Sequence, residues 1–218
     1  MSEINIRPMI KIDVEDCTRI HTSSFKGFFL TFLGPRFIKE LYTDILIDPT
    51  GISFVAEKDL EVVGFVVGSL DAPRLYSNLL RNHLTDFAFE GMKAVLRKPV
   101  IIPRLLRALK KPAERMPVTN SALLMSIAVM PGMQGHGIGK KLIQAFLDEA
   151  DRRGLANVLL TTDGVDNESA NKFYQGMGFS LLRTYTTPEG RVLNDYVYTL
   201  KGTPPETEPL GTAIHAKI

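Results

Sequence analysis

The stretch from Ser126 to Lys140 constrains the fold more than any other part of the chain. An apolar run passes into a turn with glycines at 135, 137 and 139, and a helical pattern follows without a linker. Glycine permits backbone conformations closed to other residues and lets a ligand approach the main chain. Amide N–H groups at a helix start favour anions, of which a diphosphate is the commonest large one. The stretch predicts a strand, a turn and a helix around an anion site, although packing of a helix on a sheet would also account for the glycines.

The spacing of these glycines shows which of the known phosphate-binding patterns the turn can match. The dinucleotide pattern Gly-x-Gly-x-x-Gly, counted from Gly135, would need a third glycine at Lys140, and the Walker pattern would need Ser or Thr at Lys141. The pattern Gln-x-x-Gly-x-Gly does fit, as Gln134, Gly137 and Gly139. This segment resembles the pyrophosphate-binding motif of the GNAT superfamily of acyl-CoA-dependent N-acetyltransferases.

A second motif lies about thirty residues further along the chain. It matches the other GNAT hallmark, Asn-x-x-Ala-x-x-Phe-Tyr-x-x-x-Gly-Phe, at Asn167, Ala170, Phe173, Tyr174, Gly178 and Phe179. Helical spacing places the alanine and the two aromatic residues on one face. Gly178 is expected to end the helix in a left-handed conformation, and Phe179 to return to the core. A capped amphipathic helix with Tyr174 as a core aromatic would look the same, but two motifs in the family's order favour GNAT.

The resemblance implies acetyl-CoA as the co-substrate and a set of residues that bind it. Backbone amides of the glycine turn would hold the diphosphate, and the main chain of the preceding strand would pair with the pantetheine arm. The residues implied are Ile127, Ala128, Val129, Gln134, Gly135, His136, Gly137, Ile138, Gly139, Lys140, Asn167, Ala170, Phe173 and Tyr174.

The chemistry implied is direct attack of a neutral amine on the acetyl thioester. Tyr174 occupies the family's position for the general acid, and main chain near Ile127 to Val129 would stabilise the oxyanion. Relatives often carry a carboxylate on the strand before the cofactor loop, and residues 122–126 contain none. Glu57 and Asp163 are the candidate bases, and deprotonation through water is an equal alternative.

The acceptor is expected to be a primary amine of a small molecule or a sugar, including a nucleotide sugar. Phe25, Phe28 and Phe29 supply aromatic surface where the family forms its acceptor site, and packing at a helix junction is the competing interpretation. Two other functions stay open. One is a GNAT-fold module that binds acyl-CoA without catalysis, and the other is acetylation of protein N-termini.

The pattern of apolar residues predicts an α/β protein with a mixed sheet. By resemblance the sheet is of GNAT type, mostly antiparallel and flanked by helices, with a helical insertion between the third and fourth strands. Residues 1–200 form the single predicted domain, and 201–218 a flexible tail. The expected strands are 4–8, 52–56, 61–70, 121–130, 157–162, 180–186 and 192–200. The expected helices are 12–25, one beginning at Gly34-Pro35, 138–153 and 167–176, with Asp13 as an N-cap of the first.

The predicted insertion, residues 74–117, differs in character from the rest of the chain. Between Arg74 and Lys111 there are nine Lys and Arg residues and two acidic residues. We expect two or three short amphipathic helices, broken at Pro99, Pro103 and Pro112. Packing onto the domain is the favoured role. A lid over the acceptor, a homodimer surface and contact with an anionic membrane are alternatives.

Composition excludes several other functions. The single cysteine, Cys17, rules out a disulfide framework, and four histidines without ligand spacing argue against a metal site. A net charge of +2 gives no reason to expect nucleic-acid binding. The first residues lack the pattern of a signal peptide, and no apolar run is long enough to cross a bilayer. We expect a cytoplasmic protein.

Overall fold

The computed structural model describes residues 3–25, 29–82, 118–188 and 190–200. The strands are β1 (Asn5–Pro8), β2 (Gly51–Lys58), β3 (Glu61–Ser69), β4 (Ser121–Val129), β5 (Asn157–Asp163), β6 (Ser180–Thr186) and β7 (Val192–Thr199). The helices are α1 (Asp13–Ser24), α2 (Phe29–Phe32), α3 (Pro35–Ile47), α4 (Ala72–Asn82), α7 (Ile138–Arg152) and α8 (Glu168–Gly176). The predicted fold class, a mixed and mostly antiparallel sheet with flanking helices, is confirmed.

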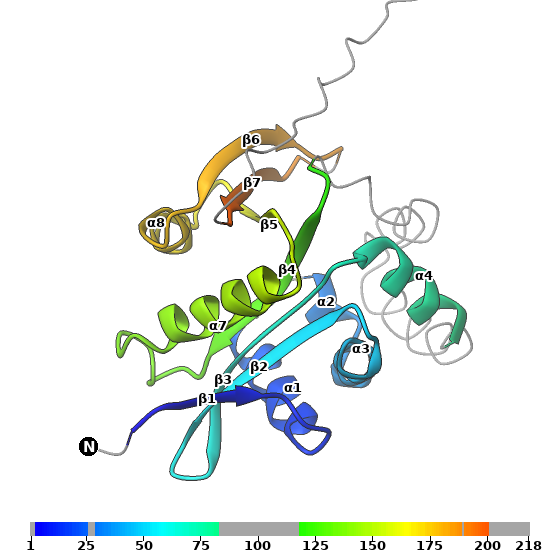
Figure 1. The fold of residues 1–218 in the computed structure, drawn as a ribbon, viewed down its shortest axis with the longest axis vertical. Coiled ribbons are helices and arrows are strands. Elements are labelled where there is room, and N and C mark those ends of the chain that lie inside the picture. The colour runs from blue at the N-terminus through cyan, green and yellow to red at the C-terminus, as the bar shows by residue number, and fades with distance from the viewer. Residues whose placement is uncertain (1–2, 26–28, 83–117, 189, 201–218) are drawn as a thin grey trace, which may run out of the picture.

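One seven-stranded sheet, in the order β1-β2-β3-β4-β5-β7-β6, organises the molecule (Figure 1). All neighbours are antiparallel except β4 and β5. Helices α1, α3 and α4 contribute to the core on one face, and α7 with side chains of α8 to the core on the other. Alternation along the strands divides the apolar residues between these two cores.

The parallel pair β4 and β5 separates soon after it begins. Pairing covers only Ser121–Leu123 against Asn157–Leu159, although both strands continue for several residues. Figure 1 shows the β5–β7–β6 part of the sheet turning away from the β1–β4 part. The second half of β4 therefore has one edge that no strand pairs with in the described part of the chain.

A β-bulge in β4 determines which backbone N–H and C=O groups face this open edge. Ser126 pairs with Val67 and Leu124 with Gly68, which leaves Met125 without a partner on β3. Beyond the bulge, the Met130 N–H donates to the Val63 carbonyl at 2.8 Å.

Hydrogen-bonded positions alternate along an antiparallel pair. Since Met130 bonds to β3, Ile127 and Val129 direct their N–H and C=O groups to the opposite, unpaired edge.

The first helix corrects one local prediction. Asp13 is the first residue of α1 and not its N-cap, which is Ile12 without a side-chain cap. The Asp13 carboxylate accepts hydrogen bonds from the Ile10 N–H and from Arg7, at 2.6 and 2.9 Å for the latter. Arg7 also pairs with Glu57 at 2.7 Å. Asp13 therefore joins β1 to the start of α1, because its buried charge is matched by an arginine.

The start of the predicted insertion is an ordinary helix packed on the domain. Helix α4 begins at Ala72, and its Leu75 and Leu79 are fully buried in the core with α1 and α3. The rest of the insertion, with its predicted further helices, and the predicted tail 201–218 lie outside the described residues. Within the described ranges, no helix is long and apolar enough to traverse a bilayer.

Candidate active site

The glycine turn forms the N-terminus of α7, as predicted. Gly137 is the N-cap residue with φ +76°, and Gly135 has φ +83°, both in the left-handed region. A side chain would be strained there, whereas glycine lets successive amides face the space before the helix. No side chain caps this end of α7. The first turn of the helix thus retains N–H groups that can donate hydrogen bonds to an anion.

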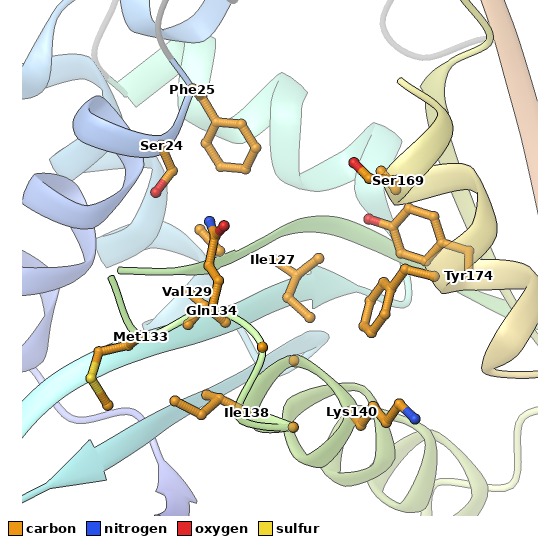
Figure 2. Close-up of a pocket in the computed structure, with 16 residues that line it drawn as sticks. Ser24, Phe25, Ile127, Val129, Met133, Gln134, Ile138, Lys140, Ser169 and Tyr174 are labelled. Atoms are coloured by element: carbon orange, nitrogen blue, oxygen red, sulfur yellow. The ribbon is translucent and has the colours of Figure 1, made fainter. Parts of the chain in front are cut away.

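A cleft of about 520 Å³ lies between this turn, the open edge of β4 and helix α8. Figure 2 shows Ile127 and Val129 at its base, and Gln134 extending toward Ser24 and Phe25 at the end of α1. The predicted cofactor residues that line it are Ile127, Ala128, Val129, Gln134, Gly135, Gly137, Ile138, Gly139, Lys140, Ala170, Phe173 and Tyr174. Its shape suits an extended ligand with an anionic end, because it joins a helix N-terminus to an unpaired strand edge.

Tyr174 lies where this cleft meets a second one. Its ring contacts Phe173, Phe179 and Tyr196, at centroid separations of 5.5, 6.0 and 6.2 Å. Burial raises the pKa of the Tyr174 phenol to about 12. The hydroxyl therefore stays protonated at neutral pH, where it can donate a hydrogen bond.

The second cleft, of about 330 Å³, shares Phe25, Ile127 and Tyr174 with the first. Its remaining lining comes from the end of α1, from α2, from the diverging halves of β4 and β5, and from the start of β7: His21, Leu30, Leu124, Met125, Ser126, Leu160, Thr161, Thr162, Asp163, Arg191 and Leu193. Two cavities that meet at one phenol and one strand edge give room for two reactants.

The two predicted carboxylates have different surroundings. Asp163 lines the second cleft, and its Oδ1 accepts both hydrogen bonds from Arg191, at 2.6 and 3.2 Å. Glu57 lines neither cleft and is held by Arg7. The structure therefore brings Asp163, and not Glu57, together with Tyr174.

Two other predicted residues, His136 and Asn167, are absent from both cleft linings. His136 is exposed, with Nδ1 2.9 Å from the Gln134 carbonyl. Asn167 does not cap α8 with its side chain, and it donates to the Thr162 hydroxyl at 2.7 Å instead. Phe28 lies outside the described residues, and only the backbone of Phe29, in α2, is described.

Some residues that the clefts contain were not among the predicted site residues. Ser24, Met133 and Ser169 line the first cleft, and His21 and Arg191 the second. Ser169 lies inside the second motif, at one of its variable positions. No local pattern marks the others, since their positions depend on how distant elements meet. Within the described ranges, no cluster of His, Cys, Asp and Glu could hold a metal ion.

Comparisons with known proteins agree with this geometry. The model of the Acetyltransferase (GNAT) family matches residues 14–179. N-alpha-acetyltransferase 30 of Schizosaccharomyces pombe is 43% identical over 61 residues, which are 28% of this chain and 40% of that protein. The ribosomal protein bS18-alanine N-acetyltransferase of Escherichia coli is 35% identical over 78 residues, 34% of this chain and 52% of that one. The chain thus spans about half the length of these curated relatives.

Solved structures show the same fold. An acetyltransferase from Salmonella typhimurium, determined with acetyl-CoA, superimposes with a TM-score of 0.60 at 14% identity, covering 93% of this chain and 98% of that one. The chain belongs to the GNAT acetyltransferase family, which confirms the family predicted from the two motifs.

Proposed function

We propose that this chain is an acetyl-CoA-dependent N-acetyltransferase acting on a primary amine. The observation that carries the proposal is the meeting of the two clefts at Tyr174 and Ile127. A module that only held acyl-CoA would need the first cleft alone. A second cleft open to the same phenol supports catalysis over the non-catalytic alternative.

Acetyl-CoA fits the first cleft by the chemistry of its parts. The diphosphate would lie against the amides around Gly137, and the pantetheine amides would pair with Ile127 and Val129 at the open strand edge. Lys140, which lines the same cleft, adds positive charge near the phosphates. This arrangement would direct the thioester toward Tyr174.

The reaction needs one bond formed and one broken. The amine nitrogen bonds to the acetyl carbon, the carbon–sulfur bond breaks, and one proton passes in net from nitrogen to sulfur. Tyr174 donates a hydrogen bond to the departing sulfur. Full transfer of its proton is unfavourable, because a thiol has a pKa of about 8.5 and the phenol is a weaker acid. The phenol therefore acts chiefly by stabilising negative charge on sulfur.

Asp163 is the candidate base. Both hydrogen bonds from Arg191 go to Oδ1, so that Oδ2 remains for the amine or for a water between them. The amine would enter through the second cleft, where Asp163 and Tyr174 both contribute to the lining.

The acceptor was predicted from sequence to be a small-molecule or sugar amine, and that proposal stays open. A second candidate is the α-amine of a protein, which is favoured by the names of the two relatives described above. Both candidates use the same chemistry.

The test is release of thiol from acetyl-CoA with a panel of amines that includes glucosamine, alkylamines and peptides with free N-termini. Turnover dependent on an amine supports the proposal. Binding of acetyl-CoA without turnover of any amine would instead support the binding module.

A further inference from the structure

Helix α8 carries Tyr174, yet it has no fully buried side chain. Figure 1 shows the helix beside the β5–β7–β6 part of the sheet. Its aromatic residues Phe173 and Tyr174 pack against the core and are partly buried. Few buried apolar contacts give an element low local stability. Hydrogen bonds from α8 to the strands therefore have a large share in fixing where the Tyr174 hydroxyl lies.

Three amide side chains form a polar stripe along this helix. Asn167, Asn171 and Gln175 follow one another at four-residue intervals, which places them on one side of α8. Asn167 and Asn171 each donate to a residue of β5, at 2.7 and 2.8 Å. Gln175 reaches β7 only through a bond of 3.5 Å, which is beyond the usual range. The close bonds of the stripe are thus at the start of the helix and at Asn171.

The Asn171 carboxamide uses its whole hydrogen-bonding capacity. Its Nδ2 donates to the carbonyls of Asp163 and Asn167, both at 2.8 Å. Its Oδ1 accepts from Asn194 Nδ2 and from the Tyr196 hydroxyl, both at 2.9 Å. One side chain of α8 is therefore bonded to β5, to β7 and to the residue before its own helix. Asn171 occupies a variable position of the second motif, so the motif does not account for it.

The Asp163 carbonyl needs this bond because the sheet does not supply one. The N–H of the same peptide unit, that of Gly164, donates to the Val192 carbonyl on the β7 side at 2.9 Å. The C=O and N–H of a trans peptide point in opposite directions, so the Asp163 carbonyl points to the other edge of β5. On that edge, β4 pairs only as far as Leu159. Asn171 takes the place of the donor that a neighbouring strand would provide.

The bond from Asn171 to Asp163 also links the two groups assigned to the chemistry. Tyr174 lies three residues after Asn171 on α8, and the Asp163 side chain is the candidate base. Strand β5 is paired with β7 along its whole length, whereas α8 has no fully buried residue. Loss of the bond would therefore displace α8, and with it the Tyr174 hydroxyl, more than it would displace β5.

We propose that Asn171 is a positioning residue, which holds α8 on the end of β5 and thereby places the Tyr174 hydroxyl at the departing sulfur. The proposal rests on the proposed N-acetyltransferase function and adds to its site a residue that lines neither cleft. Asn171 acts on kcat more than on the affinity for acetyl-CoA, because the diphosphate is proposed to bind at the start of α7, a separate helix.

The test uses two substitutions of Asn171. Asn171→Asp keeps the size of the side chain and an oxygen for Asn194 and Tyr196, but it loses both donors. Asn171→Leu removes the same donors without adding a charge. Gln175→Met is the matched control, because it lies on the same polar stripe, is absent from both cleft linings and has only the long bond to lose.

We would measure kcat with whichever of glucosamine, butylamine and trialanine the wild type acetylates fastest, and the affinity for acetyl-CoA by calorimetry. We expect kcat to fall at least about tenfold in both Asn171 variants, because small displacements of a reacting group are costly. The affinity for acetyl-CoA should stay within about threefold of the wild type, since the diphosphate site is unchanged. Gln175→Met should match the wild type in both measurements. An unchanged kcat in both folded Asn171 variants would overturn the proposal.

A double-mutant cycle distinguishes positioning from a general loss of stability. In a Tyr174→Phe background the hydroxyl is already absent, so Asn171→Asp should lower kcat by less than about threefold. The same factor in both backgrounds would mean that Asn171 does not act through Tyr174, which contradicts the proposal.

Hydrogen exchange separates the failure of this proposal from the failure of the proposed function, because it needs no turnover. Amides of α8 should exchange at least about tenfold faster in Asn171→Asp than in the wild type, with the amides of α7 unchanged. If the wild type acetylates none of the three amines, the proposed function fails for them, and faster exchange in α8 would still support the anchoring of this helix by Asn171. Unchanged exchange in α8 would overturn the anchoring itself.

Discussion

Gly139 in α7 lies directly against the ring of Phe173 in α8, and a Cβ added to this glycine would stand 3.2 Å from the Phe173 Cζ atom. Real Cβ contacts are seldom so close, so that the ring would have to shift by a few tenths of an ångström. Both residues line the first cleft. The glycine therefore sets the separation of the two motif helices where the cofactor is proposed to bind.

We expect Gly139→Ala to weaken acetyl-CoA binding by roughly 5- to 30-fold, which corresponds to about 1–2 kcal/mol of strain. The free energy of unfolding should change little, because alanine also favours the helix by up to about 1 kcal/mol. Titration calorimetry and urea unfolding measure the two effects.

Gly176→Ala is the matched control, since a Cβ there meets nothing within 4 Å. Gly176 is also helical, in α8, and it should leave the affinity unchanged. Equal affinities for acetyl-CoA in the Gly139 and Gly176 variants would contradict the packing argument.

Tyr174→Phe should lower kcat by roughly 10²–10³-fold, the usual cost of removing one hydrogen-bond donor to a developing negative charge. The affinity for acetyl-CoA should stay within about twofold, because the ring and its packing remain. Steady-state kinetics and calorimetry on the same preparation check both values.

Tyr196→Phe is the comparison for the loss of a phenol. Tyr196 donates to Asn171 Oδ1 at 2.9 Å and lines neither cleft. Its removal should cost about 1 kcal/mol of stability and leave kcat unchanged. A Tyr174→Phe enzyme as fast as Tyr196→Phe would exclude the phenol from the chemistry.

The two candidate bases can be separated by mutation. Asp163→Asn should lower kcat/KM for the amine by about 10²-fold, because the carboxylate lies in the cleft with Tyr174. Glu57→Gln should change kcat/KM less than twofold, because Glu57 lines neither cleft and is held by Arg7 in a partly buried ion pair. Wild-type rates in Asp163→Asn would leave deprotonation to water.

Stability should depend on pH through His21. Burial lowers its pKa from 6.5 to about 4, so between these values the unfolded chain binds a proton that the folded chain does not. The free energy of unfolding therefore falls as the pH is lowered through this range, by about 2 kcal/mol between pH 7 and pH 5 for this group.

Urea unfolding of the wild type and of His21→Asn at the two pH values isolates that contribution. The loss of stability from pH 7 to pH 5 should be about 2 kcal/mol smaller in His21→Asn. The same pH dependence in both proteins would show that His21 is not held neutral by burial.

The first cleft could be largely predicted from sequence because its parts are local. The turn around Gly137 and the residues Ala170 to Tyr174 are short segments whose spacing reflects one helix start and one helix face. The second cleft could be predicted less well from sequence. His21 falls within the predicted helix 12–25, but its contact with Tyr42 depends on how α1 packs against α3, which the pattern of apolar residues does not indicate.

Other features were missed for the same physical reason. Arg191 and Asp163 are 28 positions apart in sequence. They pair only because β5 and β7 are neighbours in the sheet. The bulge at Met125 changes which side of β4 each residue faces, and a uniform run of apolar residues cannot signal it. Asp13 has the residue type of an N-cap, but its carboxylate accepts hydrogen bonds from Arg7 and from the Ile10 amide instead.

The most direct test of the whole account is the calorimetric affinity of the purified chain for acetyl-CoA, compared with S-acetylpantetheine, which has the same thioester arm and no phosphate. We expect one site for acetyl-CoA and an affinity at least about 100-fold lower for S-acetylpantetheine, a difference of about 2.7 kcal/mol. No measurable heat with acetyl-CoA, or equal affinities for the two compounds, would contradict the assignment of the Gln134–Gly139 turn as the diphosphate site.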